Sequence, residues 1–351
     1  RTCRLKCNDA GMTTPERFRP AWWCRNPHWQ TLWPHVFRRR PDTPLERERL
    51  ELPDGDFLDL AWNMDATGPL VLVMHGLEGS LRSHYAAGLI DALHRAGYRV
   101  LFMHFRNCSG EPNRLPRSYH SGDTADLQHV IGHVLARTGA PPFAAVGFSL
   151  GGNVLLKWLG EQGAQAPLKT AVAVSVPFLL GDAADRMERG WSRLYQTHLV
   201  GRLRRSYARK FARMPSPLSV DVRRLRTFRQ FDDQVTAPLH GFAGVDDYYG
   251  RSSSRQFLKK IRVPTLIVHA RDDPFMWPRT VPAADELSES VRLELTEHGG
   301  HVGFVAGRWP WRPRWWLDGR IIGYLDAHRG PGAGIAAWRP LLPSDRVPGC
   351  R

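Results

Sequence analysis

The sequence predicts an α/β fold built on a mainly parallel central sheet. Short apolar runs alternate with amphipathic segments of helical spacing, an alternation typical of a parallel sheet covered by helices. One long segment without a strand-like run interrupts the alternation, which predicts a helical insertion into a single α/β core. The predicted strands are residues 68–76, 98–105, 143–148, 170–176, 263–270 and 291–297, and the helices between the first of them are residues 84–97, 124–137 and 151–163.

The first elements show how each prediction is made. The run from Gly68 to Gly76 is rich in Val and Leu and closes on glycine, as expected of a strand buried on both faces. Apolar residues at helical spacing follow in 84–97, which ends at a glycine stop. The next strand, 98–105, is again short and apolar.

The insertion and the two ends of the chain differ in composition from this core. Residues 180–255 are rich in arginine and helical in composition, and we expect them to form a helical cap within a single α/β domain of residues 18–325. Residues 1–17 are predicted to be a disordered or wrongly assigned N-terminal extension. The Pro- and Gly-rich residues 326–351 are predicted to form a loosely ordered tail.

Composition limits the classes of protein to consider. The chain has 351 residues, 42% of them hydrophobic and 24% charged, which is ordinary for a globular protein. Its apolar runs, such as Thr170 to Leu180, are shorter than the ~20 residues of a membrane-spanning helix. No signal-peptide pattern opens the sequence, and the five cysteines are scattered without disulfide or metal-site spacing. We therefore predict a cytoplasmic protein without a metal.

The net charge of +15 raises the question of an acidic partner. The richest stretch, residues 201–214, could present a basic face to phosphates or acidic lipid headgroups. We interpret it as a solvated helix face, and no zinc-finger, helix-turn-helix or RNA-binding motif accompanies it. Nucleic acid is therefore not predicted as a partner, while weak membrane-surface association through the basic cap stays open.

The stretch "VGFSLGGN" places Ser149 between two glycines, after a predicted strand and before a predicted helix. In Gly-x-Ser-x-Gly a tight turn leaves no room for side chains at Gly147 and Gly151 and projects the serine hydroxyl above the sheet. The following helix directs its free N–H groups toward negative charge near that hydroxyl. A phosphate-binding loop is the alternative, but its Gly-Lys-[Ser/Thr] ending is absent. We predict a nucleophilic serine.

A serine nucleophile needs a base and a carboxylate that orients the base. Two acids, Asp272 and Asp273, follow the predicted strand 263–270, and two histidines, His298 and His301, follow the next strand. We select Asp273 because it lies three residues after a small residue. We select His301 because the two preceding glycines let the backbone approach the serine.

Acyl transfer also needs donors for an oxyanion. The N–H of Leu150, directly after the nucleophile, is the first candidate, and the N–H of Leu77 in "MHGLEGS" is the second. In this prediction His75 and Gly76 shape the loop and take no part in proton transfer.

With these residues in order, the chain resembles the α/β-hydrolases. More narrowly, it resembles the bacterial YheT-type hydrolases and their eukaryotic ABHD1/ABHD3-type and Emb8-like relatives. The resemblance covers residues 18–325 and implies esterase activity on short- or medium-chain esters, acylglycerols or phospholipids. Asn107 departs from it, since glycine is expected there. The motifs that carry it are "NPHWQTLWP", "HGLEGS", "FRNCSGEPNRLPRSYHSGDTADL", "FDDQVTAPLHGFAGVDDYYGRSSS", "ARDDPF" and "GGHVGF".

Other reactive side chains are interpreted as structural. Cys108 has no base nearby in sequence, and His129 and His133 lack the glutamate of a metalloprotease motif. We therefore expect a serine hydrolase that needs no cofactor and takes a small ester or lipid as its substrate. The alternatives are an acyltransferase, phospholipase or lipase with the same triad, and a non-catalytic binding protein that has kept the fold.

Overall fold

The structure is a computed structural model that describes residues 17–41 and 43–330. The expected N-terminal extension and C-terminal tail thus lie almost wholly outside the described residues. The last described helix, α10 (Trp316–Ala327), continues two residues past the boundary expected at residue 325.

An eight-stranded, mostly parallel sheet forms the centre, which confirms the predicted fold class. Its strand order is β1-β2-β4-β3-β5-β6-β7-β8, and only β2 runs antiparallel to its neighbours. From β4 through β3, β5, β6 and β7 to β8, each strand pairs in parallel with its neighbour in the sheet. The carboxyl ends of these strands therefore lie at the same edge of the sheet. The strands are β1 (Glu46–Glu51), β2 (Phe57–Asn63), β3 (Leu70–Met74), β4 (Arg99–Met103), β5 (Ala144–Phe148), β6 (Thr170–Val174), β7 (Thr265–Ala270) and β8 (Val291–Thr296).

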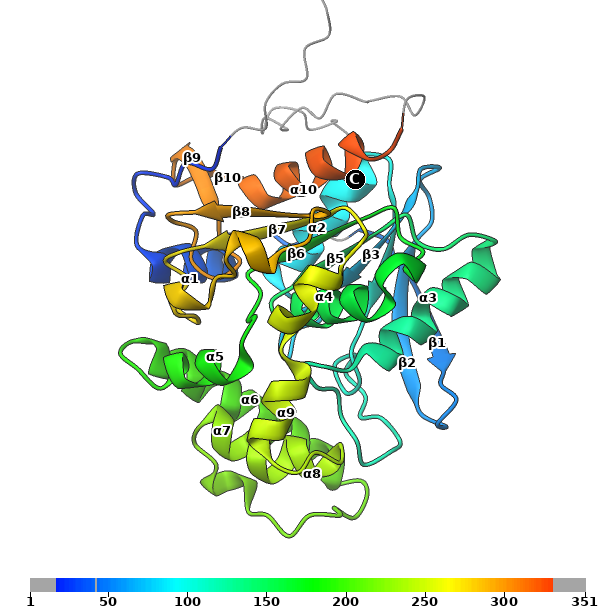
Figure 1. Ribbon diagram of the computed structural model, residues 1–351, viewed down its shortest axis with the longest axis vertical. Helices are drawn as coiled ribbons and strands as arrows, with labels where there is room; N and C mark the ends of the chain where they lie inside the picture. Colours follow the sequence, from blue (N-terminus) through cyan, green and yellow to red (C-terminus); the bar gives the residue numbers. More distant parts are fainter. Residues whose placement is uncertain (1–16, 42, 331–351) are drawn as a thin grey trace, which may run out of the picture.

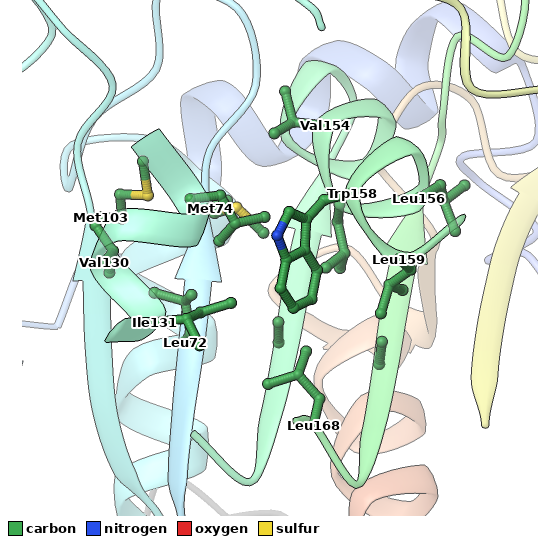
Figure 2. Packing of buried hydrophobic residues seen from close by; sticks show 14 of the residues in the cluster. Leu72, Met74, Met103, Val130, Ile131, Val154, Leu156, Trp158, Leu159 and Leu168 are labelled. Carbon is green, nitrogen blue, oxygen red and sulfur yellow. The ribbon is translucent and has the colours of Figure 1, made fainter. Parts of the chain in front are cut away.

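Helices cover both faces of this sheet (Figure 1). Side chains of α3 (Thr124–Thr138) and α4 (Leu150–Gln162) pack on one face together with Leu72 of β3. On the other face, α2 (His84–Arg95) and α10 pack against the alternate side chains of the same strands. Figure 2 shows the Trp158 indole of α4 among the apolar side chains of the first face. These two cores hold the strand ends rigidly in place.

The helical insertion, residues 180–252, lies between β6 and β7, beyond the carboxyl ends of the parallel strands (Figure 1). Its longest helix, α6, is followed by shorter ones and by a π-helical turn at residues 232–236. No strand occurs among these residues, as the composition predicted. The helices are α5 (Leu180–Met187), α6 (Ser192–Phe211), α7 (Phe228–Phe231), α8 (Ala237–Leu239) and α9 (Val245–Ser252).

Several further elements were not predicted, including strands β1 and β2 at one edge of the sheet. Helix α1 (Pro27–Phe37) starts at Asn26, whose side chain accepts hydrogen bonds from two N–H groups of its first turn. Strands β9 (Val305–Trp309) and β10 (Arg312–Trp315) form a separate two-stranded sheet. In the described part of the chain no helix is both long and apolar enough to cross a membrane.

Candidate active site

Ser149 occupies a strained turn between β5 and α4. Its φ of 51° and ψ of −118° lie where residues other than glycine are rarely found. A side chain at Gly147 would place its Cβ 2.5 Å from the carbonyl oxygen of Gly151, and a Cβ at Gly151 would lie 2.5 Å from the carbonyl oxygen of His75. The two glycines are therefore required by close backbone contacts, and the turn directs Ser149 into a cavity.

The structure brings Ser149, His301 and Asp273 together in one hydrogen-bonded chain. His301 Nε2 lies 3.0 Å from Ser149 Oγ, and His301 Nδ1 lies 2.8 Å from Asp273 Oδ2. The other carboxylate oxygen of Asp273 accepts a hydrogen bond from the N–H of Phe275 at 2.8 Å. Because an ionised carboxylate only accepts, Nδ1 carries the proton and Nε2 faces the serine as an acceptor. The Asp273 side chain is 1% exposed and that of His301 is 11% exposed.

Asp272 and His298, the candidates not selected, form a separate pair. His298 Nδ1 lies 3.1 Å from Asp272 Oδ2, and the N–H of Gly300 donates to Asp272 Oδ1 at 3.0 Å. Burial raises the pKa of Asp272. The His298 side chain is 49% exposed, so it faces solvent while Asp272 fastens the turn that precedes His301.

Contacts from distant parts of the chain hold the His301 loop, and the sequence analysis missed them. The hydroxyl of Thr31 in α1 accepts the N–H of His301 at 3.0 Å, and that of Ser175 accepts the N–H of Val302 at 3.0 Å. The Phe275 ring stacks on the imidazole with centroids 4.0 Å apart and an interplanar angle of 8°. The motif that contains Thr31 was noted only as part of a resemblance, because its contact with His301 spans 270 residues.

Leu77 and Leu150, the predicted oxyanion donors, both line the cavity that contains Ser149. Leu150 begins α4, so its N–H has no partner within the helix. The N–H groups on either side of Leu77 are held by tyrosine hydroxyls, that of Gly76 by Tyr85 at 2.8 Å and that of Glu78 by Tyr119 at 2.7 Å. Within the described residues the N–H of Leu77 itself makes no hydrogen bond, so it is free for a ligand.

His75 supports this loop as a neutral imidazole. Its Nδ1 lies 2.7 Å from the carbonyl oxygen of Gly76, and its Nε2 accepts the N–H of Phe105 at 3.1 Å. The second contact makes Nδ1 the protonated nitrogen. Complete burial lowers the pKa of His75 to about 3, so the ring stays uncharged near neutral pH.

An apolar cavity of about 160 Å³ extends from Ser149 into the helical insertion. Asp232 lies on its wall and accepts hydrogen bonds from Thr236 Oγ1 and from the Tyr249 hydroxyl, each at 2.7 Å. Burial raises the pKa of Asp232 to about 6. Apolar lining residues contributed by the insertion include Leu180, Met187, Leu199, Leu203, Phe228 and Phe231.

The other reactive side chains in the described part of the chain form no second centre. Burial raises the pKa of Cys108 well above its usual value, so its thiol is not activated. His133 Nε2 lies 3.0 Å from a carboxylate oxygen of Glu48. Among residues 17–41 and 43–330, no group of three or more His, Cys, Asp or Glu side chains is placed to hold a metal ion.

Comparison with known proteins shows which family and which relatives the chain is similar to. A family model described as the alpha/beta hydrolase fold matches residues 69–307. The chain is 45% identical to YheT of Escherichia coli (strain K12) over 310 residues, covering 86% of this chain and 91% of that protein. It is 32% identical to the phospholipase ABHD3 of Bos taurus over 308 residues, covering 84% of this chain and 75% of the relative.

A solved structure shares the fold at lower identity. The esterase Pf2001 of Pyrococcus furiosus superposes with a TM-score of 0.54 at 17% identity, covering 92% of this chain and all of that one.

Proposed function

This chain belongs to the α/β-hydrolase fold family, and from that premise we propose that it hydrolyses a carboxylic ester through an acyl-serine intermediate. The observation that carries the proposal is the hydrogen-bonded chain from Ser149 through His301 to Asp273 at one end of an apolar cavity. The similarity of this chain to proteins named as an esterase, a phospholipase and a monoacylglycerol lipase supports the same reaction class.

The first half-reaction acylates the serine. As Ser149 Oγ attacks the ester carbonyl, His301 Nε2 takes the hydroxyl proton across the 3.0 Å contact. Asp273 accepts the hydrogen bond from Nδ1–H and stabilises the imidazolium that forms. The tetrahedral oxyanion is held by the N–H groups of Leu77 and Leu150. His301 then donates its proton to the departing alcohol.

In the second half-reaction water is the nucleophile and Ser149 is the leaving group, while His301 again acts first as the base and then as the acid. Water enters in place of the alcohol, His301 takes one of its protons, and the hydroxide attacks the acyl carbonyl. Collapse of the second tetrahedral intermediate releases the carboxylic acid and returns the proton to Ser149. No step requires a cofactor, because His301 supplies and removes every proton.

The composition of the cavity indicates that it binds the acyl group of the substrate and that this group is apolar. Most of the lining contributed by the helical insertion is aliphatic or aromatic, which favours an acyl chain over a polar substituent. The polar lining residues of the insertion are Ser206, Lys210, Asp232, Thr236 and His240. A small ester or an acylglycerol-type lipid fits this description. We interpret the insertion as the cap that selects the acyl chain.

Two alternative functions make different predictions. An acyltransferase with the same triad would pass the acyl group to an added alcohol in preference to water, which product analysis detects. A non-catalytic binding protein would retain ligands in the cavity without turnover. The N–H of Leu77, which has no hydrogen-bond partner among the described residues, supports catalysis because such a donor stabilises the oxyanion of a tetrahedral intermediate.

The test is hydrolysis of p-nitrophenyl esters from acetate to palmitate. We expect a maximum at one chain length and a loss of about 10⁴-fold or more in kcat for Ser149→Ala. Ser206→Ala is the matched control, because Ser206 lines the same cavity but lies outside the hydrogen-bonded chain of Ser149, His301 and Asp273. Equal activity of S149A and the wild type would refute the proposal, and an inactive wild type would refute ester hydrolysis.

A further inference from the structure

Helix α1 exposes its apolar side chains, although a helix of a globular domain ordinarily buries them. Its buried side is polar: Gln30 bonds neighbouring backbone, and the hydroxyl of Thr31 accepts the N–H of His301. The exposed side carries four large apolar residues: Trp29, Leu32, Val36 and Phe37. The helix is thus the reverse of an ordinary surface helix, which indicates a partner for its apolar side.

Three neighbouring segments extend this exposed apolar surface. The start of α6 adds Trp191 and Leu194, the hairpin of β9 and β10 adds Trp309 and Trp311, and the segment before α1 adds Trp22. We give the name apolar face to the four exposed residues of α1 together with Trp22, Trp191, Leu194, Trp309 and Trp311.

Contacts between rings and backbone join these segments. The His28 ring of α1 lies 6.5 Å from the Trp191 ring, and the rings of Trp23 and Trp33 are 4.9 Å apart. The indole N–H of Trp22 donates to the carbonyl oxygen of Arg308 in the hairpin at 3.0 Å. In Figure 1, α1, α5 and the β9–β10 hairpin accordingly lie along the same side of the molecule.

The concentration of exposed apolar side chains on this side is specific. Among the described residues, the large exposed hydrophobic side chain outside the apolar face is that of Leu135 in α3. Single exposed apolar residues are normal on a protein surface, but a group of them marks an interaction site.

The segments that carry the apolar face are rich in arginine and poor in acids. Residues 17–41 contain six arginines and residues 305–316 contain three, and neither range contains an aspartate or a glutamate. In residues 186–198, Glu188 is the one acid. Arg25, Arg39 and Arg40 are exposed and form no ion pair with another described residue. The partner should therefore combine an apolar interior with negative charge at its surface.

We propose that the apolar face docks onto the surface of a lipid bilayer that contains anionic lipids. Tryptophan side chains favour the boundary between headgroups and acyl chains, and arginines beside them are attracted to anionic headgroups. The inference goes beyond ester hydrolysis, because docking does not involve Ser149. It also differs from association through the basic residues 201–214, because the apolar face belongs to other residues.

Charge favours a bilayer over a second copy of this chain as the partner. A dimer formed through the apolar face would bring the arginines of two chains, each with a net charge of +15, into proximity. Like charges that meet at an interface destabilise it. An anionic bilayer instead attracts the same arginines while it accepts the tryptophans.

The apolar face lies close to the proposed active site. Thr31, on the buried side of α1, bonds the N–H of His301. Next to Leu194, the Tyr195 ring lies 5.0 Å from that of Phe275, which stacks on the His301 imidazole. A molecule docked through this face would thus hold its active site near the lipid.

The test is cosedimentation of the protein with vesicles of equal parts phosphatidylcholine and phosphatidylglycerol. We expect the wild type to bind these vesicles and to bind pure phosphatidylcholine more weakly. Trp191→Ser/Trp311→Ser exchanges side chains that are 73% and 72% exposed. It should lower the partition coefficient by about tenfold or more, because two large apolar side chains no longer leave water on binding.

The matched control is Leu135→Ser, which exchanges an apolar side chain that is 48% exposed on α3. It should bind vesicles as the wild type does. Both variants should keep the thermal unfolding midpoint of the wild type, so that lost binding is not due to unfolding. Ser149→Ala should also bind as the wild type does, which keeps this test separate from that of ester hydrolysis.

Three results would overturn the inference. The first is a wild type that binds neither kind of vesicle, including one that sediments as a dimer which W191S/W311S dissociates. The second is an equal loss of binding in W191S/W311S and L135S. The third is full binding by W191S/W311S together with lost binding by Arg204→Gln/Arg205→Gln, since adsorption would then occur through the basic residues 201–214.

Discussion

Tyr119 fastens the loop that carries the proposed oxyanion donor, and Tyr119→Phe removes that fastening alone. The hydroxyl accepts the N–H of Glu78 at 2.7 Å and donates to the Glu78 carboxyl oxygen at 3.0 Å. Both bonds end on the residue that directly follows Leu77. Glu78 also has a φ of 53°, so this part of the loop is strained and depends on its bonds.

The expected loss of kcat in Tyr119→Phe depends on which contacts remain after the hydroxyl is removed. The phenyl ring keeps its stacking on Phe105, whose centroid lies 5.5 Å away, so almost no packing is lost. The N–H of Glu78 loses its partner in a partly buried place, which costs about 1–3 kcal/mol. Complete loss of an oxyanion donor lowers kcat by about 10²–10³-fold. Loosening the loop without deleting the donor should therefore lower kcat by about 10–100-fold.

Steady-state kinetics on the preferred p-nitrophenyl ester measure this effect. We expect KM to change little, because an oxyanion hole binds the transition state more strongly than the substrate. Tyr98→Phe is the matched control: it removes a hydroxyl that donates to Asp326 at 2.7 Å, and neither residue lines the cavity. A Y119F enzyme with the kcat of the wild type, or an equal loss in Y98F, would refute the positioning role.

The remaining predictions concern the acidic side chains. Asp273→Asn should lower kcat by about 10⁴-fold, because the amide no longer fixes the His301 tautomer. Asp272→Asn is the control and should retain most of the activity, because its amide oxygen can still accept the N–H of Gly300. Equal losses of kcat in the two variants would contradict the assignment of Asp273. For Asp232, burial raises the pKa from 3.8 to about 6, so its ionisation disfavours the folded state. Stability should be highest with this acid protonated and should fall by about 3 kcal/mol as the pH rises from about 4 to above 6. Denaturant unfolding of the wild type and Asp232→Asn across this range measures it, and parallel curves would contradict it.

Much of the site could be predicted because its signals are local in sequence. The spacing of Gly147 and Gly151 around Ser149 reflects contacts with adjacent backbone, which the structure shows at 2.5 Å. Likewise, Asp273 and His301 directly follow β7 and β8, and parallel strands bring such positions to one edge.

The supporting contacts could not be predicted, because they join segments that only the folded chain brings together. Nothing in the residues around Thr31 indicates that its hydroxyl receives the N–H of His301. Strand β1 was missed for a different reason. Its sequence, "ERERLE", has one apolar residue and so lacks the alternating apolar pattern that predicts a strand. The strand is stabilised by its antiparallel pairing with β2 at the edge of the sheet.

Backbone strain links the predicted and the unpredicted parts of the site. Among the described residues other than glycine, positive φ angles occur at six positions. Glu78, Asn107 and Ser149 line the cavity, Ser175 and Val302 hold the His301 loop, and Phe304 lies in the core three residues after His301. Two of these strained residues bond each other, since the Ser175 hydroxyl accepts the N–H of Val302. Strain of about 1–3 kcal/mol at each position persists only where the surroundings over-determine the conformation. The two apolar cores on either side of the sheet supply that constraint. Long-range packing that the sequence does not reveal therefore holds Ser149, His301 and Asp273 in their hydrogen-bonded arrangement.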